Sequence, residues 1–269
     1  MSDQSPTWPL APQPWPASTN CTTVTVRDVR VICTQPEGIR LIVVKIETSE
    51  PGLYGLGCAT FCQRATAVVD AVENYLKPMI MGRDVADIED IYQTGYLSSY
   101  WRTGPIMNNA LSGVDQALWD LKGKMANMPV YQLLGGKTRR AATVYTHASG
   151  DTIEETVEAV RAKMAAGFTH VRAQVAVPGY HTYGTAAKAA VQQPWHEAAY
   201  VRIVPKLFDT LRTQLGDEVE LLHDIHERIH PILAINLAKD LETFRLFFLE
   251  DPFAPEDIGW FQRMREATP

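Results

Sequence analysis

Two carboxylates and an imidazole stand where apolar, strand-like runs of the sequence end. Asp224 and His226 follow one run two residues apart, so the period of a strand points both side chains the same way. Glu250 ends the next run, 26 residues further on. Carboxylates that converge without thiolates are ligands for a hard cation, so the spacing predicts a Mg²⁺ site in preference to a Zn²⁺ site. The alternative is that Asp224 caps the following helix and that Glu250 is an ordinary polar strand end.

A second metal motif overlaps this site. Residues His226 to His230 fit H-E-x-x-H, the zinc peptidase pattern, which needs a helix to place both histidines on one face. Here the motif directly follows a strand-like run, and Pro231 disfavours helical backbone at His230. We therefore expect a loop, with His230 solvated and His223 on the opposite face of the strand from Asp224. A zinc hydrolase is therefore the least favoured of three hypotheses for the function, and the other two follow below.

A cation and a phenol precede this region. Arg172 lies in a strand-like run, and Tyr183 lies in the long loop that follows it. A guanidinium near a phenol favours the phenolate and lowers its pKa from about 10, which would make Tyr183 a base. A tyrosine in a long loop more often serves packing, so both interpretations stay open on these residues alone.

The second half of the chain alternates strand-like runs with segments of helical periodicity. This alternation predicts a parallel sheet covered by helices, either a (β/α) barrel or an open doubly wound sheet. No glycine-rich phosphate-binding loop follows any of the strands, which favours the barrel, where chemistry is built at the carboxyl ends of the strands. The strands are expected at residues 142–146, 170–174, 219–224 and 246–250, and the helices at 153–166, 198–215, 232–243 and 256–267.

The first half of the chain has a different pattern. β-rich runs over residues 23–31 and 41–46 precede a turn, and from Ala65 to Met125 the apolar residues recur at helical steps. The pattern predicts a compact α+β unit that ends at the glycine pair 135–136. The parts that we expect are a flexible proline-rich tail without the features of a secretory signal (1–20), the α+β domain (21–136) and the β/α domain (137–269).

Composition limits the partners. Lys and Arg number 25 against 31 Asp and Glu, a net charge of −6, which argues against nucleic acid as a partner. Hydrophobic residues make up 46% of the chain, but no apolar run approaches the roughly 18 residues of a membrane span. The four cysteines form no C-x-x-C pair, so we expect reduced thiols and a cytoplasmic location.

Five stretches of the chain share their residue patterns with one enzyme family. They are Tyr100–Pro105, Val114–Asp120, Asn127–Gly136, Leu221–His226 and Leu249–Pro252. Together they resemble the mannonate dehydratase branch of the enolase superfamily, with its mandelate racemase/muconate lactonizing fold, from about Val31 to the last residue. The resemblance implies an α+β capping domain, residues 21–136, over a (β/α)₇β barrel of the TIM type, of which residues 137–269 would form the first half.

The resemblance also implies a reaction. It is the Mg²⁺-dependent dehydration of a sugar acid, D-mannonate or a related aldonate such as D-gluconate, to a 2-keto-3-deoxy sugar acid, by a carbon–oxygen lyase that tends to form homo-oligomers. Proton transfers by a base and an acid, beside a metal that neutralises developing charge, suit this chemistry. The implied roles are Mg²⁺ ligands for Asp224 and Glu250, base for Tyr183 assisted by Arg172, acid at the departing 3-hydroxyl for His226, and substrate binding for His147.

Three features depart from the family pattern. The segment from Arg172 to Tyr183 is one residue shorter than usual, so the position of Tyr183 rests on a Thr-Tyr-Gly match. Arg40 stands where the family presents a substrate-binding Asn, which extends the candidates from D-mannonate to D-gluconate. The third Mg²⁺ ligand is expected one repeat further on, at about position 276, beyond Pro269.

Because of this third departure, we expect a barrel truncated after about four βα units. We also expect weak metal binding and no dehydration by these residues alone. The alternative function is a non-catalytic relative, or a fragment, that binds a sugar acid or a protein partner without turnover.

Overall fold

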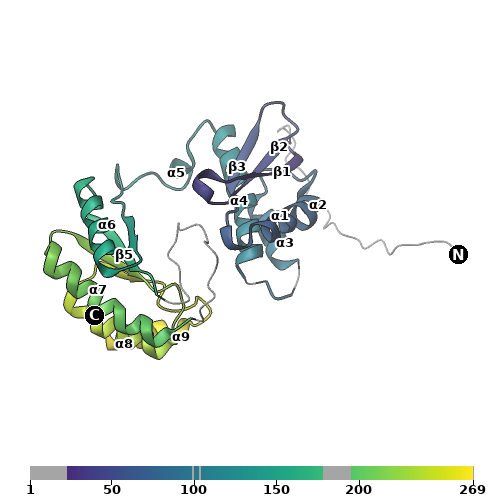
Figure 1. Cartoon of the computed structure of the whole chain (residues 1–269). Coiled ribbons are helices and arrows are strands. Elements are labelled where there is room, and N and C mark those ends of the chain that lie inside the picture. Colours follow the sequence, from purple (N-terminus) through teal and green to yellow (C-terminus); the bar gives the residue numbers. More distant parts are fainter. Residues whose placement is uncertain (1–22, 99, 103, 178–194, 269) are drawn as a thin grey trace. The chain divides into compact units, whose positions relative to one another are not determined.

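The computed structural model describes residues 23–98, 100–102, 104–177 and 195–268. The chain divides into two compact units, Met1–Thr138 and Arg139–Pro269 (Figure 1), and each has its own core of buried apolar residues. The tail expected at residues 1–20 and the candidate base Tyr183 lie outside the described residues. Within the described ranges, no helix is both long and apolar enough to cross a membrane.

The first unit is an α+β domain in which a three-stranded antiparallel sheet packs against helices. The sheet order β1-β2-β3 follows the chain, so the sheet is an antiparallel meander. Every second residue of β2 is buried, so one face of the sheet belongs to the core. The elements are β1 (Val26–Thr34), β2 (Leu41–Thr48), β3 (Tyr54–Cys58), α1 (Ala65–Asp70), a π-helical segment (Ala71–Leu76), α2 (Lys77–Ile80), α3 (Ile88–Leu97), α4 (Pro105–Met125) and α5 (Val130–Leu133), with 3-10 turns at Pro36–Gly38 and Cys62–Arg64.

The long helix α4 lies directly on β3. A Cβ atom on Gly57 would lie 2.0 Å from the carbonyl oxygen of Gly113, so only glycine allows this approach. Gln116 and Asp120, four residues apart on α4, accept hydrogen bonds from two backbone N–H groups of β3 at 3.1 and 2.8 Å. One edge of β3 pairs with no strand among the described residues, and these two side chains of α4 satisfy hydrogen-bond donors along it.

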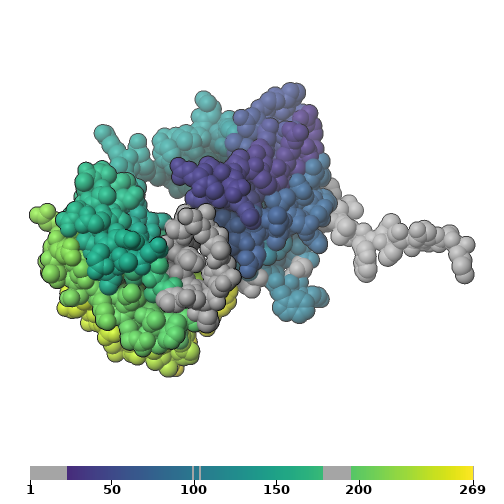
Figure 2. Space-filling model, viewed as in Figure 1, coloured from purple at the N-terminus to yellow at the C-terminus, as the bar shows by residue number. Residues whose placement is uncertain are grey.

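The second unit is a parallel sheet of order β4-β5-β6-β7 in which each strand is followed by a helix. The elements are β4 (Thr146–Gly150), α6 (Ile153–Ala165), β5 (His170–Val175), α7 (Glu197–Leu215), β6 (Glu220–Asp224), α8 (Pro231–Leu241), β7 (Phe248–Glu250) and α9 (Ile258–Ala267), with a 3-10 turn at Glu242–Phe244. Figure 2 shows side chains of these helices, from teal-green to yellow, packed over the outer surface of the unit. The alternation that the sequence predicts is therefore present.

The first strand of this sheet differs from the expectation. The strand expected at residues 142–146 begins only at Thr146, because β4 pairs with β5 from Thr146 to Gly150. The β-branched residues before Thr146 lie outside this ladder, and Val144 is exposed. The expected strand would have placed His147 directly after its last residue. In the structure His147 is instead the second residue of β4.

The parallel register gives the sheet two unlike faces. It pairs His147 with Arg172, and Asp224 with Glu250. Arg172 pairs with Leu222, which lies two residues before Asp224 on β6 and so on the same face. All four polar side chains therefore share one face of the sheet. An open doubly wound sheet would have helices on both faces, whereas a barrel wall has them on one. The residues that alternate with the polar ones are buried in the core with the helices: Ala148, Val171, Ala173 and Leu221.

Candidate active site

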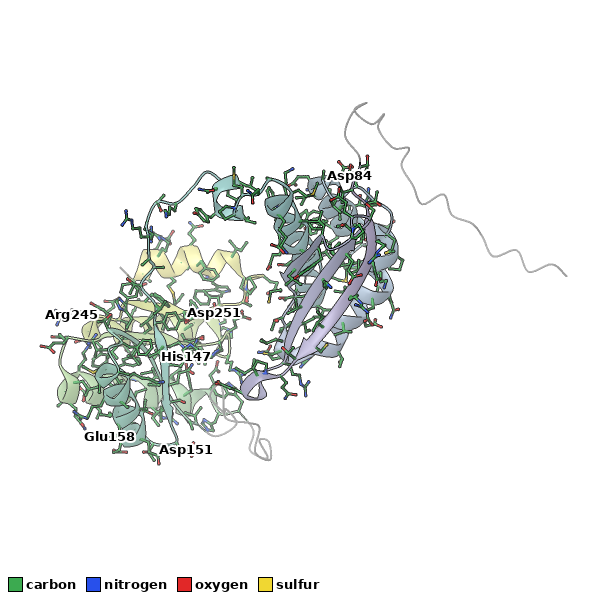
Figure 3. All side chains as sticks on the ribbon, turned by 90° about the horizontal axis from the view of Figure 1, so that it is seen from above. Asp84, His147, Asp151, Glu158, Arg245 and Asp251 are labelled. Carbon is green, nitrogen blue, oxygen red and sulfur yellow. The ribbon has the colours of Figure 1, made fainter. Side chains whose placement is uncertain are left out.

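The candidate site lies on the face of the sheet opposite the helices, near the carboxyl ends of β5, β6 and β7. The structure brings together five of the six residues that the sequence predicts, because the register of the parallel strands places their side chains on one face of the sheet. Figure 3 labels His147 within the second unit, and Asp251 directly after β7. The five are His147, Arg172, Asp224, His226 and Glu250, and Tyr183 lies outside the described residues.

A buried ion triad forms the centre of the site. Arg172 Nη1 donates to the Asp224 carboxylate and lies 3.3 Å from Glu250 Oε2. Arg172 is 5% exposed and Asp224 is 2% exposed, so each charge depends on the other for compensation. Burial raises the pKa of Asp224, but the hydrogen bond from His226 and the charge of Arg172 outweigh burial, so the net pKa lies below its ordinary value. Asp224 is therefore an ionised carboxylate at neutral pH.

His226 bends over this carboxylate. Its Nε2 lies 2.8 Å from Asp224 Oδ2, and its backbone N–H donates to Asp224 Oδ1 at 2.8 Å. An ionised carboxylate only accepts, so Nε2 carries a proton. Gln174 Nε2, from β5, lies 3.3 Å from His226 Nδ1 and donates to the Asp224 carbonyl at 3.0 Å.

The H-E-x-x-H segment is a loop, as the sequence predicts, and forms no zinc helix. His226 and Glu227 have φ of +56° and +57°, in the left-handed region, and α8 begins only at Pro231. His230 is exposed and caps α8, whereas His226 faces the carboxylates. His223 is buried on the opposite face, and burial lowers its pKa to about 4.

The oxygen donors of the site fit a hard cation. Asp224, Glu250 and Asp251 can each present one carboxylate oxygen, and these atoms lie within 4.8 Å of one another. The set has no thiolate, which suits Mg²⁺. Arg172 places a positive charge between two of the carboxylates, and its buried Nε has no hydrogen-bond partner among the described residues.

Two further side chains extend the polar face. The Tyr145 hydroxyl donates to Glu250, with oxygen distances of 3.2 and 3.1 Å. His147 Nδ1 lies 3.5 Å from Arg172 Nη2. Burial, and then the charge of Arg172, lower the pKa of His147, which favours a neutral imidazole that accepts at Nδ1.

Sequence reasoning missed Gln174, Tyr145 and Asp251. Gln174 stands two residues after Arg172 on the same strand, so the strand period could have placed it in the site. Tyr145 was assigned to a strand only for its β propensity, and no pattern linked it to Glu250. Asp251 has a φ of +44°, in the left-handed region, and its carboxylate lies near those of Asp224 and Glu250. No pattern in the sequence predicts this backbone conformation.

Comparison with known proteins agrees with this geometry. Residues 17–135 match the mandelate racemase / muconate lactonizing enzyme N-terminal domain, and residues 155–269 match the enolase C-terminal domain-like family. The chain belongs to the enolase superfamily. The first unit is thus an enolase-superfamily capping domain, and the second is its barrel-like domain.

Curated relatives in this superfamily are D-galactonate dehydratase family members. One from Salmonella virchow (strain SL491) is 49% identical over 264 residues, which cover 90% of this chain and 63% of the relative. Another from Pantoea ananatis (strain LMG 20103) is 50% identical, with the same coverage. The chain therefore spans about 63% of the length of these relatives. The mannonate dehydratase branch stays a prediction, because these relatives are named for D-galactonate.

Solved structures show the same enolase-superfamily architecture. An enolase from Pantoea ananatis with bound D-gluconate and Mg has a TM-score of 0.81 at 48% identity, covering 91% of this chain and 64% of that one. A putative dehydratase from Zymomonas mobilis ZM4 has a TM-score of 0.76 at 26% identity, covering 92% of this chain and 66% of that one.

Proposed function

We propose that this chain belongs to a Mg²⁺-dependent sugar-acid dehydratase that converts an aldonate, D-gluconate or D-mannonate, to a 2-keto-3-deoxy sugar acid. The observation that carries the proposal is the cluster of Asp224, Glu250, Arg172 and His226 on the helix-free face of the sheet. The Pantoea ananatis structure, which holds D-gluconate and Mg, supports the choice of ligand.

Asp224 and Glu250, with Asp251 beside them, are the side chains that would hold the Mg²⁺. The ion would supply positive charge for the substrate carboxylate when the neighbouring C–H bond loses its proton. Arg172 lies beside the same carboxylates and adds a permanent positive charge to the site.

Acid and base roles follow from where protons can be held. We assign the base to Tyr183, as the family resemblance implies; it lies in the loop that follows β5 in the sequence, the strand that carries Arg172. The electron pair left when the C2–H bond breaks forms the C2–C3 double bond, and the C3–O bond breaks. His226 carries its proton at Nε2, as the Asp224 carboxylate requires, and delivers it to the departing hydroxyl, which leaves as water. The resulting enol becomes the 2-keto acid.

The test is a panel of aldonates incubated with Mg²⁺ and a protein that joins this chain to the remaining βα units of the barrel, with detection of the 2-keto product by semicarbazide. We expect product that disappears with EDTA from that protein and none from residues 1–269 alone. In the protein with the completed barrel, His226→Asn, which retains polarity but not the acid, should lower kcat by about 10²-fold or more. Glu250→Gln alters a proposed Mg²⁺ ligand and should also lower the activity. Its control is Glu158→Gln, which makes the same change at an exposed carboxylate of α6 and should leave the activity unchanged. Stabilisation by an aldonate without any product would instead support the non-catalytic binding protein.

A further inference from the structure

A buried polar pair lies behind Asp224, on the helix-covered face of the sheet, and takes no part in the steps above. His223 precedes Asp224 on β6 and so points to the opposite face. There it meets Tyr200, from the first turn of α7. Both side chains are at most 2% exposed. Burying two polar groups is unfavourable unless they are hydrogen-bonded, so their partners indicate what the pair does.

The hydrogen bonds of the pair connect three elements. His223 Nδ1 lies 3.0 Å from the Ala173 carbonyl oxygen on β5, and its Nε2 lies 2.8 Å from the Tyr200 hydroxyl. A carbonyl only accepts, so Nδ1 donates to Ala173 and Nε2 accepts from the phenol. The Tyr200 hydroxyl is also 3.3 Å from the carbonyl oxygen of Asp224. The single hydroxyl hydrogen is donated to Nε2, the nearer acceptor, so the pair joins α7 to β5 through His223, and the phenol oxygen lies against the Asp224 carbonyl without a full second hydrogen bond.

The end of β6 is held from both faces of the sheet. Gln174 Nε2 donates to the Asp224 carbonyl oxygen from the polar face at 3.0 Å, while on the helix side the His223 ring is bonded to Ala173 on β5 and to Tyr200 on α7. Only one methylene group separates the aspartate carboxylate from the backbone, so a fixed backbone limits the positions that the carboxylate can take. Partners that orient a metal ligand in this way typically change metal affinity when they are removed.

We propose that Tyr200 and His223 are positioning residues that fix the end of β6 so that the Asp224 carboxylate faces the Mg²⁺ site. This inference rests on the proposed function, because it takes Asp224 as a Mg²⁺ ligand. The competing explanation is that the pair only packs α7 on the sheet. Packing alone predicts lower stability after substitution, and the same Mg²⁺ affinity in the molecules that remain folded.

The experiment is a calorimetric titration with MgCl₂ alone, paired with urea unfolding in EDTA. Tyr200→Phe keeps the ring and removes only the hydroxyl. We expect it to weaken Mg²⁺ binding by about tenfold, the lower end for partners of metal ligands. The control is Val160→Ala, which opens the same apolar core from α6 and leaves the end of β6 untouched. It should lower the urea midpoint and change Mg²⁺ affinity less than twofold.

A second pair of variants tests His223. His223→Gln can still donate to Ala173 and accept from Tyr200, whereas His223→Leu can do neither, so glutamine should retain most of the Mg²⁺ affinity that leucine loses. Unchanged Mg²⁺ affinity in Tyr200→Phe, with binding by the unsubstituted protein, would overturn the positioning role alone. Failure of the unsubstituted protein to bind Mg²⁺ would overturn the proposed function, and the positioning role with it.

Discussion

Charge balance in the site depends on one arginine. Apart from His226, Arg172 is the only side chain among the described residues that forms an ion pair with Asp224 or Glu250. A divalent cation bound by these carboxylates would use the same oxygens as the guanidinium. Arg172 and the cation therefore compete for Asp224 and Glu250, and the protein without metal is stabilised by Arg172 in the position of a counter-ion.

This competition predicts opposite effects of Arg172→Met with and without metal. Removing one partner of a buried ion pair destabilises a protein by about 3–5 kcal/mol, so we expect a loss of this size in EDTA. Mg²⁺ should bind the variant more tightly than the unsubstituted protein and restore part of the stability. Urea unfolding in EDTA and in MgCl₂ measures both effects.

The matched control for this prediction is Arg212→Met. Arg212 is a partly buried arginine of the same unit that donates to the carbonyls of Phe244 and Val219, each at 2.8 Å. Its removal should destabilise the protein equally with and without Mg²⁺. The competition is refuted when Arg172→Met binds Mg²⁺ no more tightly than the unsubstituted protein.

At this scale, the predictable residues were those fixed by a strand period or a repeat spacing. Asp224, His226 and Glu250 follow from such spacing, and the structure places them together. Contacts between distant residues, such as Tyr145 with Glu250, depend on strand register, which the sequence does not specify. The roles of these side chains in catalysis stay predictions.

At the scale of elements, the contact between β3 and α4 depends on glycine. Gly57→Ala would place a methyl group 2.0 Å from the Gly113 carbonyl oxygen, so the helix would have to move. We expect a loss of about 1–3 kcal/mol in the unfolding free energy of the first unit. Gly259→Ala in α9 is the control, because a Cβ there meets nothing within 4 Å. Chemical denaturation of both variants tests the prediction, and equal stabilities would contradict it.

The pairing of α3 with α4 buries a carboxyl group. Burial, and then the charge of Glu89, raise the pKa of Asp115 above its ordinary value. The folded state therefore binds a proton more readily than the unfolded state, and stability falls as pH rises from the ordinary pKa of about 3.8 through the raised one. Above that window the penalty is fully present, and below it the penalty is absent.

Asp115→Asn should therefore stabilise the protein at pH 7 and not at pH 3. The gain should stay below about 1 kcal/mol, because Asp115 is only partly buried and solvent screens its charge. The same substitution at Asp120 on this helix should destabilise instead, since Asp120 pairs with Lys124 at 2.7 Å and accepts from β3. Urea midpoints at both pH values decide, and a gain that persists at pH 3 would count against the explanation.

Helices were more predictable than strands in this chain. The helix expected at residues 153–166 is α6, capped by Thr152, whose hydroxyl accepts from Glu155, and followed by Gly167 at φ +92°. These signals are local. The bounds of β4 depend on its pairing with β5, which is why residues 142–145 did not form the strand although Thr143 and Val144 are β-branched.

At the scale of the whole molecule, the chain consists of two units with separate cores. The change from an antiparallel meander to alternating strands and helices made this division visible in the sequence. The absence of a glycine-rich loop in the sequence favoured the barrel over the open sheet, and the helices on one face of the sheet agree with a barrel wall. The number of βα units in the full barrel stays a prediction, since the chain spans about 63% of its curated relatives.

Separate cores predict that the first unit folds without the second. We expect residues 1–138, produced alone, to unfold in one cooperative urea transition, because the sheet, its helices and the covered edge of β3 all lie within it. Val114→Asp, which places a charge in this core, should abolish the transition. Residues 139–269 should bind a hydrophobic dye such as ANS, since Phe247 and Ile258 are 55% and 73% exposed. A first unit that unfolds without cooperativity would show that its core depends on the second.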